Sequence, residues 1–212
     1  MLDTPAYAVS EAARYLRIPP ATLRAWFVGA PSRVIRGTNA KRPRMDAATL
    51  SFFHLVEAHV FRSLRIGRSV PLALRQALAY AERELSIKHL LVREELRTSP
   101  FLDRYVALLN LPPSAQLAVR KRFEAHLTRL SWDEAHLAVR LYPFVFGEGA
   151  DAKPIVIDPT IAFGKPVVDR AFVSTRTILE RIDAGEPVEE VAADYDLRVG
   201  AVEEAVLFER AA

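Results

Sequence analysis

The sequence contains no cysteine among its 212 residues, and it contains no long uncharged run. The missing cysteines exclude disulfides, zinc–thiolate fingers, iron–sulfur clusters and a cysteine nucleophile. A bilayer-spanning helix needs about 20 predominantly apolar residues, and no stretch approaches that length. The first 16 residues lack the basic start and apolar run of a secretory signal, so we expect a protein of the cytoplasm.

Motifs for catalysis and for cofactors are also missing. The eight glycines are dispersed and form no phosphate-binding loop. There is no Gly-x-Ser-x-Gly elbow, and no pair of carboxylates is spaced as a general acid and base. None of the five histidines has metal-ligand spacing, so we interpret them as ordinary core or surface residues: His54, His59, His89, His126 and His136. We therefore expect no catalytic activity, no cofactor and no bound metal.

Charge is distributed unevenly although the net charge is only +3. Residues 1–50 carry eight basic and three acidic side chains, whereas acids dominate from residue 151 onward. The stretch 33–44 contains five basic residues and no acid, namely Arg33, Arg36, Lys41, Arg42 and Arg44. A basic front and an acidic back indicate two surfaces with different partners.

Residues 8–27 predict a helix-turn-helix. Ser10 is expected to cap a short helix, the run 17–20 with its two prolines breaks it, and a second helix starts near Ala21. The first residues of a recognition helix lie near base edges in the major groove, which assigns DNA contacts to Thr22 and Arg24. The five basic residues of 33–44 would form a wing that binds backbone or a minor groove. The alternative is a helical pair in an ordinary bundle with a solvated basic loop.

The middle of the chain predicts further helices. Asp46 is expected to cap a helix that ends before Gly67, and Pro71 to open the next one. Residues 86–110 fit either a strand or a short helix, and another helix is expected from Ser114 to about Leu130. Residues 141–154, with two prolines and two glycines, are a candidate linker.

The last segment predicts a small β-hairpin followed by three helices. The β-branched runs 155–157 and 167–168 form the hairpin, and the helices cover about 174–184, 187–194 and 199–209. The last two helices are too acidic to approach phosphate, so a protein interface, for dimerisation or for a basic partner, is the better use. We assign that interface to Glu189, Glu190, Asp194, Glu203 and Glu204. A solvated helical face is the alternative.

Two stretches resemble known families. Residues 7–27, the basic loop and the helix that follows it are similar to a MerR-like winged helix-turn-helix. The runs Phe163-Gly164-Lys165-Pro166-Val167-Val168 and Ile178-Leu179-Glu180-Arg181-Ile182-Asp183-Ala184-Gly185-Glu186, within about 153–209, resemble the domain of unknown function 433 family. Where that family has a Gly-Thr-Arg turn, this chain reads Asp169-Arg170-Ala171-Phe172, so we expect the hairpin to bend differently.

Together the two halves resemble a VapB-type antitoxin of the DNA-binding helix-turn-helix kind. The resemblance implies a PIN-like ribonuclease toxin as partner and repression of the antitoxin's own operon. We therefore predict a mainly α protein in three parts: a winged helix-turn-helix over 1–85, a helical middle region and linker over 86–150, and a trihelical, homeodomain-like unit with its hairpin over 151–212. It is expected to bind double-stranded operator DNA as a homodimer. The rival hypothesis is an adaptor that binds proteins and not DNA.

Overall fold

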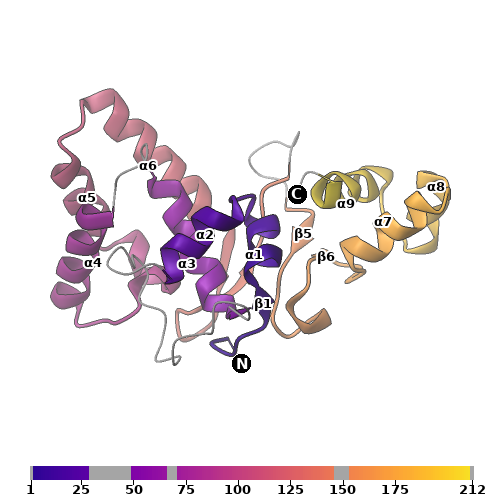
Figure 1. The fold of residues 1–212 in the computed structure, drawn as a ribbon, viewed down its shortest axis with the longest axis horizontal. Helices are drawn as coiled ribbons and strands as arrows, with labels where there is room; N and C mark the ends of the chain where they lie inside the picture. Colours follow the sequence, from indigo (N-terminus) through magenta and orange to yellow (C-terminus); the bar gives the residue numbers. More distant parts are fainter. Residues whose placement is uncertain (1, 29–48, 66–70, 146–152, 211–212) are drawn as a thin grey trace.

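A computed structural model describes residues 2–28, 49–65, 71–145 and 153–210 (Figure 1). Most of the described residues are helical, and the strands form three separate antiparallel pairs, which confirms the predicted mainly α class. Helices α4 to α6 form one end of the molecule, α7 to α9 form the other, and α1 to α3 lie between them (Figure 1). The predicted wing, with Arg33, Arg36, Lys41, Arg42 and Arg44, lies outside the described residues.

The N-terminal part has two helices joined by a three-residue turn. The strand β1 (Tyr7–Ala8) pairs with β2 (Thr49–Leu50), and β1 leads directly into α1 (Val9–Leu16), so Ala8 and not Ser10 is the N-cap. Helix α1 ends where Arg17 adopts the left-handed conformation, with a φ of 52°. The N–H of Ile18 closes the end by donating to the Ala13 carbonyl at 2.9 Å, and α2 (Pro20–Val28) follows.

Helix α3 (Phe52–Leu64) is the central helix. It begins at Ser51, whose hydroxyl accepts from the His54 N–H at 3.3 Å, and not at Asp46 as the sequence suggested. The reason is the short strand β2, which occupies 49–50 directly before the cap. Eleven of the thirteen α3 residues are buried. A helix that is apolar on most of its faces is expected to be surrounded by other elements in this way.

The region 86–110 contains short helical segments. The helix α4 (Pro71–Leu85) leads into two 3-10 segments, Leu90–Val92 and Glu94–Arg97, and then into α5 (Phe101–Leu109). Helix α6 (Pro113–Leu127) ends before Leu130, which begins a strand. That strand, β3 (Leu130–Trp132), pairs with β4 (Ala138–Leu141) in a hairpin that the sequence analysis did not predict.

The C-terminal part agrees with the predicted hairpin and helix positions. The strand β5 (Ile155–Val156) pairs with β6 (Val167–Val168), and the short 3-10 segment η3 (Ala162–Gly164) lies between them. The helices are α7 (Thr175–Asp183), α8 (Val188–Asp194) and α9 (Val199–Arg210). Ser174 caps α7 and Pro187 precedes α8. The three helices enclose a small apolar cluster built on Ile178, Val191 and Val202.

The larger apolar core extends from the first described elements to the last helix. It contains Tyr7 of β1, Ile155 and Ile157 near β5, and Phe208 of α9. The backbones of Leu141 and Ile157 exchange hydrogen bonds of 3.0 and 2.8 Å, which join the β3–β4 hairpin to the segment after β5. Parts of the chain far apart in sequence therefore share one core, and this core holds the end of α9 against α1.

Candidate functional site

Helix α2 presents a buried face and an exposed face. Leu23, Trp26 and Phe27 are buried, and the Trp26 ring meets the Phe61 ring of α3 edge to face with centroids 4.4 Å apart. This contact fixes the rotation of α2 about its axis, because turning the helix would remove both aromatic side chains from the core.

The outward side of α2 carries the two residues assigned to DNA. Arg24 is exposed, and Thr22, two residues before it, is half-buried. The helix contains no acidic residue, so no carboxylate of α2 neutralises Arg24. Phosphate or a guanine edge is the partner that an exposed arginine on a short acid-free helix is suited to bind.

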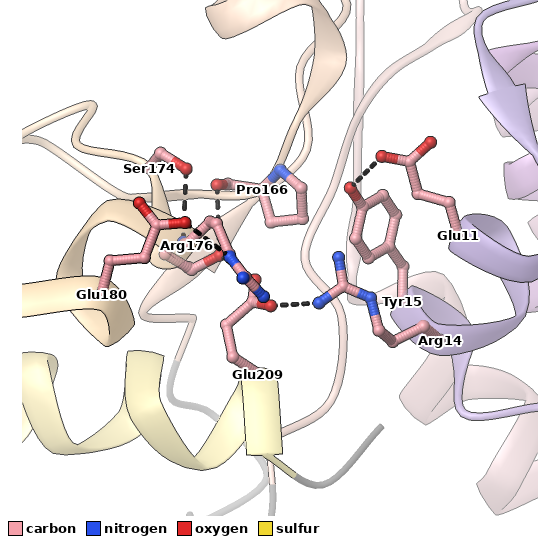
Figure 2. A network of polar contacts seen from close by, with 9 residues as sticks. Glu11, Arg14, Tyr15, Pro166, Ser174, Arg176, Glu180 and Glu209 are labelled. Carbon is pink, nitrogen blue, oxygen red and sulfur yellow. Dashed lines mark hydrogen bonds and ion pairs between the residues drawn. The ribbon is translucent and has the colours of Figure 1, made fainter. Parts of the chain in front are cut away.

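A polar network joins α1, the first helix of the helix pair, to the C-terminal part (Figure 2). The Arg14 guanidinium of α1 forms an ion pair with Glu209 of α9, whose side chain is only 1% exposed. The Thr175 hydroxyl, at the start of α7, donates to the other Glu209 oxygen at 2.6 Å. We call Arg14, Thr175 and Glu209 the junction triad. It ties α1, α7 and α9 together at one point.

Aromatic contacts surround the junction triad. The rings of Tyr15 and Phe208 stack with centroids 6.2 Å apart, and the Arg17 guanidinium lies 6.0 Å from the Phe208 ring centre. The Tyr15 hydroxyl donates to Glu11 at 2.7 Å (Figure 2). Burial and that hydrogen bond to Glu11 raise the pKa of Tyr15 above its usual value, so this phenol stays protonated.

Glu209 differs from the other acidic residues of the last two helices, which the sequence suggests are at the surface. Glu209 is buried, because it lies on the same stripe of α9 as Val202, Ala205 and Phe208. The positions 201, 202, 205, 208 and 209 follow helical spacing, so the pattern contained a signal for its burial. A carboxylate on an apolar stripe requires a cation opposite it, and Arg14 supplies that cation.

The acidic residues assigned to a protein interface lie at the surface. Glu189, Glu190 and Glu203 are exposed, Glu204 is half-buried, and Asp194 is exposed. Asp194 also has a partner inside the chain, because Arg181 of α7 donates to it at 2.6 Å. The same arginine pairs with Glu186 and holds the pKa of that carboxyl below its usual value. Asp194 therefore links α7 to α8, whereas Glu189, Glu190 and Glu203 have no such pairing among the described residues.

The turn after β6 adopts left-handed backbone without a glycine. Arg170 has a φ of 75° and Phe172 a φ of 55°. Both residues therefore adopt a backbone conformation that is sterically unfavourable for any residue except glycine.

Within the described residues, no three histidine or acidic side chains gather as metal ligands, and no helix has the length and apolar character needed to cross a membrane.

Residues 155–208 match the family described as "Protein of unknown function (DUF433)", which confirms the resemblance found in the C-terminal sequence. The chain is 27% identical to a Mycobacterium tuberculosis protein named "Putative antitoxin VapB45", over 91% of this chain and 89% of that protein. It is 26% identical to "Uncharacterized protein Rv2308" of the same organism, over 97% of this chain and 90% of that protein.

A solved structure has a closely similar fold. The crystal structure of Rv2018 from Mycobacterium tuberculosis superimposes with a TM-score of 0.76 at 27% sequence identity. The match covers 97% of this chain and 99% of that one, so the similarity extends over the N-terminal, middle and C-terminal parts together.

Proposed function

We propose that this protein is the antitoxin of a toxin–antitoxin pair, that it neutralises a PIN-like ribonuclease toxin, and that it binds operator DNA to repress its own operon. The observation that carries the proposal is the similarity to the relative named an antitoxin, which extends over nine-tenths of both chains. Antitoxins act by binding, so we also propose that the chain has no catalytic activity of its own.

In this proposal the N-terminal part binds DNA as a homodimer on a palindromic site. Thr22 and Arg24 would contact bases or phosphates from α2, and the basic residues of 33–44 would contact the backbone. The exposed acids Glu189, Glu190 and Glu203 would face the toxin, because the RNA-binding site of a ribonuclease is expected to be basic.

Toxin neutralisation is best tested with surface variants. Truncation after residue 150 would remove Ile155, Ile157 and Phe208 from the main core, so a loss of function would not identify a binding surface. The triple variant Glu189→Lys, Glu190→Lys and Glu203→Lys changes only exposed side chains. We expect it to lose protection against RNA cleavage by the purified toxin, whereas Glu84→Lys, on the exposed side of α4, keeps it.

The outcomes separate the hypotheses. Full protection by the triple variant would show that the toxin does not bind through these acidic residues of α8 and α9. Absence of protection by the wild-type protein would contradict the antitoxin function. RNA cleavage by the purified protein alone would contradict the proposal that it is not an enzyme.

A further inference from the structure

Phe163 is 94% exposed, more than any other large hydrophobic side chain in the described part of the chain. It lies in η3, within the Phe163-Gly164-Lys165-Pro166 run that the proposed DNA and toxin contacts leave unused. A single exposed apolar residue is common, but an aromatic side chain with almost no contact to its own fold is not.

The backbone that carries Phe163 is held in a strained conformation. Ala162, Phe163 and Gly164 all have positive φ, at 47°, 57° and 77°. A bulky residue rarely adopts this conformation, and such strain persists only where the surrounding structure enforces it. Exposing Phe163 in this backbone is therefore unfavourable for the isolated fold.

Several contacts enforce that conformation. The Gly164 N–H donates to the Ile161 carbonyl at 2.8 Å, and a Cβ at Gly164 would collide with the Tyr7 hydroxyl. Asp158 accepts from the Thr160 N–H at 2.8 Å and from the Thr160 hydroxyl at 2.6 Å. These contacts fix the backbone on both sides of Phe163. The phenyl ring is therefore held in its exposed position before any partner binds.

A hollow of about 300 Å³ opens beside the same segment. Leu2, Trp132 and Val139 contribute apolar side chains to its lining, and Ser131, Arg140, Asp158 and Thr160 contribute polar ones. We call it the socket. Its volume is ample for a phenyl ring, since a cavity of about 150 Å³ holds benzene.

We propose that two copies of this chain associate by inserting Phe163 of each into the socket of the other. A two-fold interface requires self-complementary surfaces, and here a protruding ring and a hollow lie only three residues apart, at Phe163 and Thr160. Charges agree with this arrangement. Lys165, two residues after Phe163 in the sequence, is exposed, and so are Asp133 and Glu134, which directly follow Trp132 of the socket. The one arginine of the socket lining, Arg140, is paired with Asp158 at 2.8 Å. The inference gives a surface to the homodimer of the proposed function and rests on that part alone.

Sedimentation of the purified full-length protein tests the inference without DNA or toxin. We expect wild-type protein to be dimeric, and Phe163→Gly to weaken the dimer by roughly 30-fold or more, as loss of a central aromatic anchor does. Glycine fits the left-handed backbone at this position, so the variant should fold. Phe172→Gly is the matched control, because Phe172 is another exposed phenylalanine with positive φ, and it should leave the dimer intact.

Disulfide cross-linking between two different cysteine variants then identifies the contact. Because the native sequence has no cysteine, only the introduced thiols can form a disulfide. Phe163→Cys protein mixed with Val139→Cys protein should form disulfide-linked dimers, whereas Phe172→Cys mixed with Val139→Cys should not. Wild-type protein that sediments as a monomer would overturn the homodimer altogether. A wild-type dimer that survives Phe163→Gly would overturn this surface alone, and neither result would bear on toxin neutralisation.

Discussion

Arg24 is the described residue on which the proposed DNA contact depends most directly. Its exposure follows from its neighbours, since Leu23 and Trp26 occupy the inward side of α2. If Arg24 reads a base, Arg24→Ala should reduce discrimination between operator and unrelated DNA by about 1–3 kcal/mol. Competition binding measures this difference. Arg83→Ala, which removes an exposed arginine from α4, should leave discrimination unchanged, and equal effects of both variants would mean that only overall charge matters.

Arg14 supports a different prediction at the residue scale, because Glu209 is buried and Arg14 is 32% exposed. Arg14→Ala leaves the carboxylate buried, with Thr175 as its remaining side-chain hydrogen-bond partner among the described residues. Breaking a fully buried pair costs about 3–5 kcal/mol, and solvent access to Arg14 reduces this, so we expect a loss of about 2 kcal/mol in the free energy of unfolding.

Urea denaturation checks the size of that loss. Arg120→Ala breaks an exposed ion pair between α6 and Asp103 of α5, far from Glu209 in the sequence, and is expected to cost less than about 0.5 kcal/mol. A similar small loss for Arg14→Ala would show that the junction triad contributes little to stability.

At the scale of elements, the packing of α3 on α6 depends on two neutral histidines. His59 of α3 and His126 of α6 are buried with ring centroids 4.7 Å apart, and each ring contacts a backbone carbonyl, at 3.0 and 2.9 Å. Burial lowers the pKa of His126 to about 4 and that of His59 well below its usual value, and Arg62 and Arg129 lower both further.

These pKa values predict acid sensitivity. The unfolded chain takes up protons near pH 6.5 while the folded histidines stay neutral, so stability is complete above that pH and falls as pH decreases toward about 4. Urea midpoints measured at pH 7.5 and pH 5 should differ for wild-type protein and differ less for His126→Gln. His89→Asn, at an exposed histidine, should behave like wild type, and equal acid loss in the His126 variant would contradict this account.

At the scale of the whole molecule, the sequence predicts local features better than distant ones. The positions of α7, α8 and α9 follow from Ser174, Pro187 and helical spacing, which act within one turn of the chain. The β3–β4 hairpin was missed because its two strands contain only seven residues and alternate weakly. The junction triad joins residues 195 positions apart, and no local pattern pairs Arg14 with Glu209.

The same distinction applies to the candidate site. The exposed side of α2 could be predicted from the spacing of Leu23 and Phe27. The socket could not, because Leu2, Trp132 and Asp158 come together only when three segments of the chain pack. The five basic residues of 33–44 lie outside the described residues, so their role in DNA binding stays a prediction.

The central claim is that this protein regulates its own operon, and a mobility-shift titration against its own upstream DNA tests it most directly. We predict specific retention in the presence of unrelated competitor DNA, with affinity that falls steeply between low and high salt because phosphates are bound. Arg24→Ala should reduce the preference for the operator over unrelated DNA. Absence of retention at low salt would contradict the claim and favour an adaptor that binds only proteins.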